Sequence, residues 1–88
     1  MDVQARIRNF VEQNFYVAEG DRLSDEVSLL RTGIVDSTGV LEIIGFLETE
    51  FGIDVEDRDA VPANLDSIAR IAAFVGRKVA AAGSREVA

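Results

Sequence analysis

The sequence contains no cysteine, no histidine and a single proline, and only 7% of its residues are aromatic. Without cysteine the chain can form neither disulfides nor thiolate metal centres, and without histidine it lacks the commonest general base of enzymes. The few aromatic side chains are too sparse to build a surface that stacks nucleic-acid bases. These absences exclude disulfide-stapled scaffolds and histidine-based catalysis, and we expect no metal site.

Basic side chains are also scarce relative to acidic ones. Nine lysine and arginine residues stand against sixteen aspartate and glutamate residues, which gives a net charge of −7. Such a surface repels phosphate backbones and anionic membranes, so we expect no nucleic acid among the partners. It favours fast encounters with basic patches on other proteins, although many small proteins are acidic simply to stay in solution.

Long apolar runs are missing as well. No run reaches the length that crosses a membrane, and the first residues lack the apolar core of a secretory signal. We therefore expect a cytoplasmic monomer without membrane insertion. A chain of 88 residues has room for one small domain. We expect that domain to span residues 1–82 and a flexible tail to span residues 83–88.

Three segments carry apolar residues at helical spacing. They span residues 2–16, residues 36 or 37 to 51, and residues 65 to about 81. Gly52 is suited to end the second helix, and Asn64 is suited to cap the third. The predicted buried faces are Val3, Ile7, Phe10, Val11 and Phe15 in the first; Val40, Ile43, Ile44, Leu47 and Phe51 in the second; and Leu65, Ile68, Ile71, Ala72, Val75 and Val79 in the third.

Two connections join these segments. Residues 18–36 form a loop long enough to need apolar anchors of its own, with a short helical turn near residues 27–30. A second helical turn is expected near residues 58–61, and Pro62 forbids its simple continuation. The pattern predicts an all-α fold, a small antiparallel bundle of three main helices and a short third one. The candidate loop anchors are Leu23, Val27, Leu29, Leu30 and Ile34.

The most informative position is the junction between the long loop and the second helix. Asp36 and Ser37 are both strong N-cap residues, so the pair by itself indicates capping. A hydroxyl at a helix start is also exposed and held still, and the helix N-terminus favours a negative charge placed there. Ser37 has no base near it in the sequence, so a phosphoryl transfer to its hydroxyl needs a partner enzyme.

The context of this pair adds information that the pair alone lacks. A glycine precedes Asp-Ser, an amphipathic helix follows it, and Phe-Gly-Ile marks the helix exit. The residues concerned are Leu29-Leu30, Gly33-Ile34-Val35-Asp36-Ser37-Thr38, Val40-Leu41-Glu42-Ile43-Ile44, Leu47-Glu48-Thr49-Glu50-Phe51-Gly52-Ile53, Asn64-Leu65-Asp66-Ser67-Ile68 and Ala72-Ala73-Phe74-Val75. Together they resemble the acyl carrier and peptidyl carrier protein family over roughly residues 3–80.

The resemblance implies a four-helix bundle in which Ser37 carries 4′-phosphopantetheine taken from coenzyme A. Asp36 matches the acid that helps to position magnesium and the transferase. The thiol of the arm holds an acyl or aminoacyl group as a thioester. The implied partners are a phosphopantetheinyl transferase, an acyl- or aminoacyl-activating ligase, and downstream synthase or transferase enzymes. The chain itself is then a discrete carrier for fatty-acid, polyketide or nonribosomal-peptide biosynthesis, and not an enzyme.

Thr38 and Gly45 depart from the family pattern, in which larger apolar residues are common at both positions. By helical angle both lie near Leu41 and Glu42, on the flank that meets partner proteins in the family. With Glu48, these residues are the predicted partner contacts. Because this flank has less apolar surface than is common in the family, we expect a dedicated set of partners in a specialised pathway of aminoacyl, peptidyl or polyketide type.

Two other interpretations compete with a modified carrier. A carrier-like subunit could stay unmodified and bind a basic partner through the second helix, or the chain could be an unrelated helical regulator. The intact Asp-Ser pair after a glycine favours the modified carrier, because a scaffold needs that serine only for capping.

Two further features need an explanation of their own. Phe46 lies opposite the apolar face of the second helix, and we expect it to pack beneath the long loop, with an exposed contact as the alternative. Residues 54–59 are mostly acidic, but an EF-hand loop needs glycine and glutamate where Asp59 and Leu65 stand. We interpret that run as a solvated edge that can face a partner.

Overall fold

The computed structural model describes the backbone of residues 2–15 and 23–87, and the side chains of residues 2–15 and 23–81. Four α-helices and one 3₁₀ turn lie in these ranges, and no described residue is in a strand. The elements are α1 (Val3–Asn14), α2 (Ser37–Phe51), the 3₁₀ turn η1 (Asp57–Asp59), α3 (Pro62–Leu65) and α4 (Ile68–Val87). The predicted all-α fold of three main helices and one short helix is confirmed. None of the described helices is both long and apolar enough to cross a membrane.

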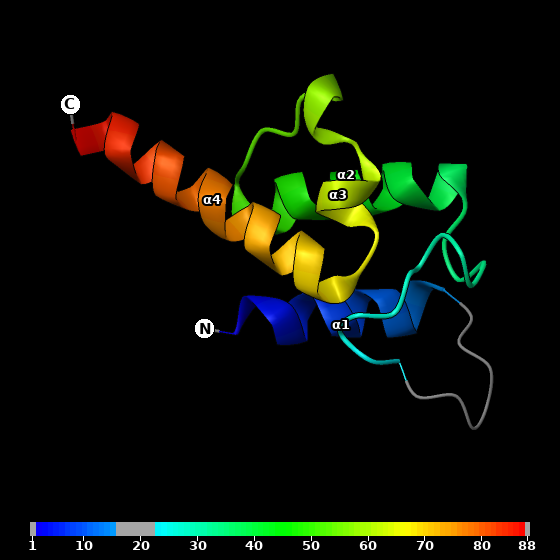
Figure 1. Cartoon of the computed structure of the whole chain (residues 1–88). Helices are drawn as coiled ribbons and strands as arrows, with labels where there is room; N and C mark the ends of the chain where they lie inside the picture. Colours follow the sequence, from blue (N-terminus) through cyan, green and yellow to red (C-terminus); the bar gives the residue numbers. More distant parts are fainter. Residues whose placement is uncertain (1, 16–22, 88) are drawn as a thin grey trace.

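The three main helices do not simply alternate in direction. In Figure 1, α1 runs opposite to both α2 and α4, whereas α2 and α4 point the same way. The expectation of an antiparallel bundle is therefore wrong for α2 and α4. The physical reason is the connection over residues 52–67, which contains η1 and α3 and is long enough to carry the chain back across the bundle. The α4 helix contacts α1, α2 and α3.

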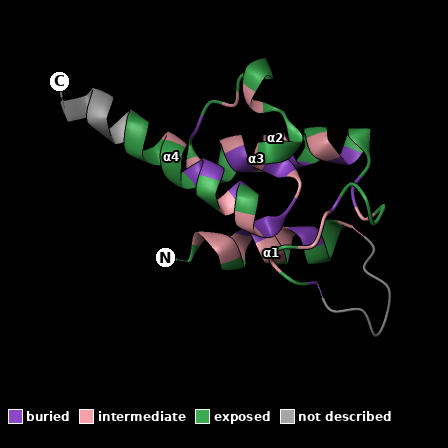
Figure 2. Cartoon of the chain, in the orientation of Figure 1, coloured by how far each residue is buried: buried purple, intermediate pink, exposed green. Residues whose placement is uncertain are grey.

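The core lies where α1, α2 and α4 face one another, and Figure 2 colours the buried residues of these helices purple. Helix α1 begins after Asp2, whose carboxylate accepts a hydrogen bond of 3.1 Å from the Ala5 N–H, and it ends before Phe15. Tyr16, the last residue of the predicted helix, lies outside the described residues. The fully buried core side chains are Ile7, Leu29, Ile43, Leu47, Ile68, Ile71, Val11, Val35 and Val75.

The described part of the long loop is anchored mostly as predicted. Leu23 and Leu29 are buried, and Val27 and Ile34 pack against the core. Leu30 is exposed, however, and Val35 is buried in its place. The predicted helical turn over residues 27–30 is a set of turns instead. The backbone turns sharply at Leu29 and Leu30, so the two adjacent side chains cannot both face the core.

The boundary between α3 and α4 differs from the prediction. The helical turn expected near residues 58–61 is present as the 3₁₀ turn η1. A further short helix, α3, begins at Pro62, where the missing N–H is not needed. Asn64 does not cap α4, because its side-chain amide donates to the carbonyl of Asp59 at 2.9 Å. Ser67 takes the capping role: its hydroxyl accepts a hydrogen bond of 3.1 Å from a backbone N–H in the first turn of α4.

The buried face of α4 includes the predicted Ile68, Ile71 and Val75, and it differs from the prediction at two positions. Phe74 is buried although the prediction omitted it, and Val79 is 47% exposed although the prediction included it. The C-terminal part of α4 extends past α1 in Figure 1. The helix continues to Val87, beyond the predicted end near residue 81. The domain boundary at residue 82 stays a prediction.

Candidate functional site

Ser37 is the first residue of α2, and its side chain is exposed. Asp36 is the N-cap: its Oδ1 accepts a hydrogen bond of 2.8 Å from the Gly39 N–H. Its backbone carbonyl also accepts the first helical bond, from the Val40 N–H at 2.9 Å. The carboxylate therefore does the capping that either residue could have done, and the Ser37 hydroxyl lies at the protein surface.

The inner side of the same turn is packed tightly. Gly39 is buried, and a Cβ atom added to it would lie 2.7 Å from Cε1 of Phe15 and 3.0 Å from Cγ1 of Val35. The phenyl ring therefore rests almost directly on the helix backbone. The first turn of α2 is held from inside while Ser37 faces outward. The spacing of apolar residues in the sequence gives no signal for this contact.

The chain approaches Ser37 through a closed turn. Gly33 has a left-handed φ of 79°, a conformation that favours glycine. The Thr32 hydroxyl donates to the carbonyl of Ser28 at 2.8 Å. The Val35 N–H donates to the carbonyl of Leu29 at 3.0 Å. These bonds fold residues 28–35 back on themselves immediately before the N-cap.

Four of the five predicted partner contacts share the exposed side of α2. Thr38, Leu41, Glu42 and Gly45 are all exposed, and among the large apolar side chains that the structure describes, Leu41 has the largest exposed fraction, 69%. Glu48 differs, because it is half-buried and its carboxylate accepts a hydrogen bond of 3.1 Å from the Val55 N–H. That carboxylate holds the chain that leaves α2. The outer flank of α2 thus combines one leucine, one glutamate and two small residues.

Phe46 packs on α1. Its ring stacks on Phe10 with centroids 4.1 Å apart and planes at 18°, and it meets Phe51 edge-on at 5.9 Å. The alternative of an exposed contact is wrong because the side chain is half-buried. That Phe46 also packs beneath the long loop stays a prediction, because part of this loop lies outside the described residues. The side of α2 opposite its main apolar face is where α1 crosses, which helical spacing within α2 cannot reveal.

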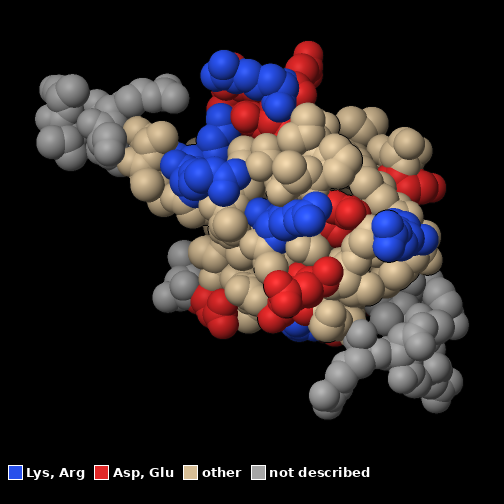
Figure 3. Space-filling model, viewed as in Figure 1, with Lys and Arg blue, Asp and Glu red and all other residues tan. Residues whose placement is uncertain are grey.

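The acidic edge around η1 is tied to α4. The Lys78 ammonium lies 2.9 Å from a carboxylate oxygen of Asp59 and 3.8 Å from one of Glu56. The hydrogen bond from Lys78, followed by one from the Glu56 N–H, lowers the pKa of Asp59 below its usual value. Figure 3 shows basic side chains lying among acidic ones on the face that displays α4. This edge is therefore partly neutralised by α4, rather than being purely solvated.

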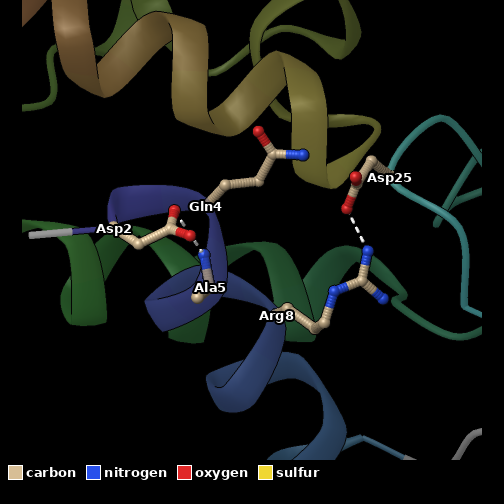
Figure 4. A pocket seen from close by; sticks show the side chains of 5 residues that line it. All are labelled: Asp2, Gln4, Ala5, Arg8 and Asp25. Atoms are coloured by element: carbon tan, nitrogen blue, oxygen red, sulfur yellow. Dashed lines mark hydrogen bonds and ion pairs between the residues drawn. The ribbon is translucent and has the colours of Figure 1, made fainter.

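A shallow hollow lies at the start of α1, lined by Asp2, Gln4, Ala5, Arg8 and Asp25. Figure 4 shows the guanidinium of Arg8 reaching toward Asp25, and the two form an ion pair. Arg8 also donates to the carbonyl of Leu23. None of the predicted site residues lines this hollow. Its polar groups join α1 to the loop, so we assign it a structural role.

Comparisons with known proteins agree with the resemblance seen in the sequence. No model of a known protein family matches the chain. Over 75 residues the chain is 25% identical to a protein described as "Probable acyl carrier protein PigG" from Serratia sp. (strain ATCC 39006). The match covers 85% of this chain and 86% of that protein. This match shows that the chain is a distant relative of a probable acyl carrier protein, in agreement with the helical fold.

Proposed function

We propose that this chain is a carrier protein that holds acyl or aminoacyl intermediates as thioesters on a 4′-phosphopantetheine arm attached to Ser37. The observation that carries the proposal is the placement of Ser37, exposed as the first residue of a helix of 15 residues. The distant relationship to a probable acyl carrier protein supports the same function. We take residues 1–82 as the carrier domain.

The surroundings of Ser37 suit the attachment chemistry. The serine oxygen attacks the phosphorus of coenzyme A that bears the pantetheine, the bond from that phosphorus to the bridging oxygen breaks, and adenosine 3′,5′-bisphosphate leaves. The serine proton passes to a base of the transferase, because the described neighbours Asp36 and Thr38 are a capping carboxylate and a hydroxyl. The N-terminus of α2 favours the charge of the phosphodiester that forms. Once attached, the arm supplies the thiol that carries the acyl group.

Asp36 supports the site in two ways. One carboxylate oxygen caps α2 through the Gly39 N–H, which fixes the direction in which the next residue points. The side chain is exposed, so its second oxygen can face the magnesium ion that a transferase brings. We therefore expect Asp36 to contribute to the transfer reaction as well as to the stability of the helix.

The outer flank of α2 is the proposed docking surface for the transferase and for the enzymes that load and unload the arm. Leu41 offers an apolar contact, Glu42 offers charge to a basic partner, and Thr38 and Gly45 leave room for close approach. This combination is the basis for proposing dedicated partners in a specialised pathway of aminoacyl, peptidyl or polyketide type.

The test is to incubate the chain with coenzyme A, magnesium and a broad-specificity phosphopantetheinyl transferase, and to record the intact mass. We expect one arm to be added to the natural chain and to Thr49→Ala, which removes another exposed hydroxyl of α2, and none to Ser37→Ala. Addition to Ser37→Ala would refute the site. Failure of the natural chain with several transferases would favour the alternative, an unmodified subunit that binds a basic partner through the same flank of α2.

A further inference from the structure

Asp66 lies between α3 and α4, and its carboxylate and backbone carbonyl accept hydrogen bonds from the loop that leads to Ser37. Its carboxylate oxygens accept hydrogen bonds from the Ser28 hydroxyl at 2.9 and 2.8 Å, and one of them also accepts from the Leu30 N–H at 3.0 Å. Its backbone carbonyl accepts from the Leu29 N–H at 2.7 Å. A single half-buried residue thus accepts hydrogen bonds from three consecutive loop residues.

A short series of bonds connects this cluster to the helix start. The Ser28 hydroxyl, which donates to Asp66, accepts from the Arg31 N–H at 3.0 Å. Leu29, which donates to the carbonyl of Asp66, accepts from the Val35 N–H at 3.0 Å. Val35 is buried, and its chain continues directly into Asp36 and Ser37. Two backbone hydrogen bonds therefore couple the helix start to the main chain of Asp66, and the carboxylate of Asp66 fixes Ser28 and Leu30, the residues on both sides of Leu29.

The other anchors of the loop act further from the helix start. The Ala69 N–H donates to the carbonyl of Asp25 at 2.8 Å, and Arg8 binds Asp25 and the carbonyl of Leu23. These contacts hold residues 23–25 against α1 and α4. They leave residues 28–35 to be held by Asp66 and by the apolar anchors Leu29 and Val35.

We propose that Asp66 is a positioning residue for Ser37, an inference that rests on the proposed function. Without its carboxylate, the Ser28 hydroxyl and the Leu30 N–H lose their shared acceptor. The Leu29 N–H keeps its bond to the Asp66 backbone carbonyl, but the residues on both sides of Leu29 are released, so the turn over residues 28–35 loosens. Only a fraction of the molecules then presents Ser37 in the geometry that the transferase binds. The apparent KM for the carrier rises as the inverse of that fraction. The kcat is unchanged, because the bound complex and its chemistry are the same.

The first arm of the test compares transfer kinetics for three variants. Asp66→Ala should raise the KM for the carrier by about tenfold, as expected for a lost hydrogen bond to a charged group, without lowering kcat. Asp66→Asn keeps an oxygen acceptor and should stay near the natural KM. Val75→Ala, which truncates a buried α4 side chain, controls for lost global stability and should leave KM unchanged at a temperature where all variants are folded.

The second arm measures amide hydrogen exchange by NMR, and it needs no transferase. In Asp66→Ala, exchange should speed up at the amides of Leu29, Leu30 and Val35, and also at those of Gly39 and Val40 in the first turn of α2. In Val75→Ala, exchange at these amides should change no more than at other amides. A KM for Asp66→Ala equal to that of Val75→Ala, or unchanged exchange at Gly39 and Val40, would overturn the proposal. If the natural chain is never modified, the proposed function fails, and the exchange data alone decide whether Asp66 positions the helix start.

Discussion

Two glycines of α2 lie in opposite surroundings, and they give a sharp test of how the helix start is packed. A Cβ atom at Gly45 would meet nothing within 4 Å, and the residue is exposed. A Cβ atom at Gly39 would lie 2.7 Å from Phe15, closer than carbon atoms of folded proteins approach one another. The same change to alanine should therefore act with opposite sign at the two positions.

The expected magnitudes follow from two terms. Alanine is better than glycine in a helix interior by up to about 1 kcal/mol, so Gly45→Ala should stabilise the protein by about 0.5–1 kcal/mol. That gain corresponds to a rise in Tm of about 2–8 °C for a domain of this size. At Gly39 the same gain is opposed by overpacking, which costs about 1–3 kcal/mol. Gly39 also lies in the first turn, where the propensity gain is smaller, so Gly39→Ala should be destabilising by about 1–2 kcal/mol.

The assay is urea denaturation followed by circular dichroism, with the free energy of unfolding extrapolated to water for each variant. Gly76→Ala in α4, where a Cβ atom also meets nothing within 4 Å, is the matched control and should behave like Gly45→Ala. In a Phe15→Leu background, the smaller side chain should reduce the cost of Gly39→Ala. A Gly39→Ala variant as stable as Gly45→Ala would refute the view that Phe15 packs on the backbone of the first turn.

Three more predictions concern separate contacts. Lys78→Met removes the hydrogen bond that lowers the pKa of Asp59, whose usual value is 3.8. A lowered carboxyl pKa stabilises the fold only while the group is ionised. The natural chain should therefore be more stable than this variant by the full amount above the usual pKa, and the difference should vanish as the pH falls through the pKa of the folded state. Urea denaturation across this pH range measures the difference. Alanine at Phe10 and at Phe46, alone and together, should give a coupling energy of about 0.5–1.5 kcal/mol in a double-mutant cycle of unfolding free energies. Asp36→Ala should cost about 1 kcal/mol through the lost N-cap, and Asp36→Asn much less, measured by thermal denaturation.

Each of these has a control and a contrary result. Arg58 is a neighbouring but more exposed cation, so Arg58→Met should change the pH dependence less than Lys78→Met; equal changes would contradict the assignment to Lys78. Additive effects of the two phenylalanine changes would show that stacking between α1 and α2 contributes nothing beyond burial. Equal losses for Asp36→Ala and Asp36→Asn would show that the carboxylate charge, rather than the capping hydrogen bond, stabilises the helix.

Elements with local signals at their ends were predictable from sequence. The bounds of α2 follow from Asp36, a strong N-cap, and from Gly52, whose left-handed φ of 66° ends the helix. The start of α4 was missed because Asn64 and Ser67 are both capping residues placed near each other. Only the tertiary contact of Asn64 with the carbonyl of Asp59 decides between them.

Some features of the candidate site could likewise be predicted from local sequence, and others depend on tertiary contacts. The exposure of Ser37 at a helix start follows from its neighbours in the sequence, and so does the exposed flank of Leu41. The contact of Glu48 with the Val55 N–H has no periodic pattern to reveal it. The stacking of Phe46 on Phe10 depends on where α1 crosses α2, and the cluster at Asp66 depends on where two distant loops meet. Contacts between segments distant in sequence were therefore the part that sequence reasoning could not supply.

The separation of Ser28 and Asp66 by 38 positions has a consequence for the order of folding. Contacts between residues so far apart close a large loop of chain and form late, after local helices have appeared. Helix α2 can start to form from its own capping signals, but the turn that precedes it is completed only when the junction before α4 arrives. During synthesis we therefore expect the segment around Ser37 to emerge first and to take its final shape only when the last helix docks.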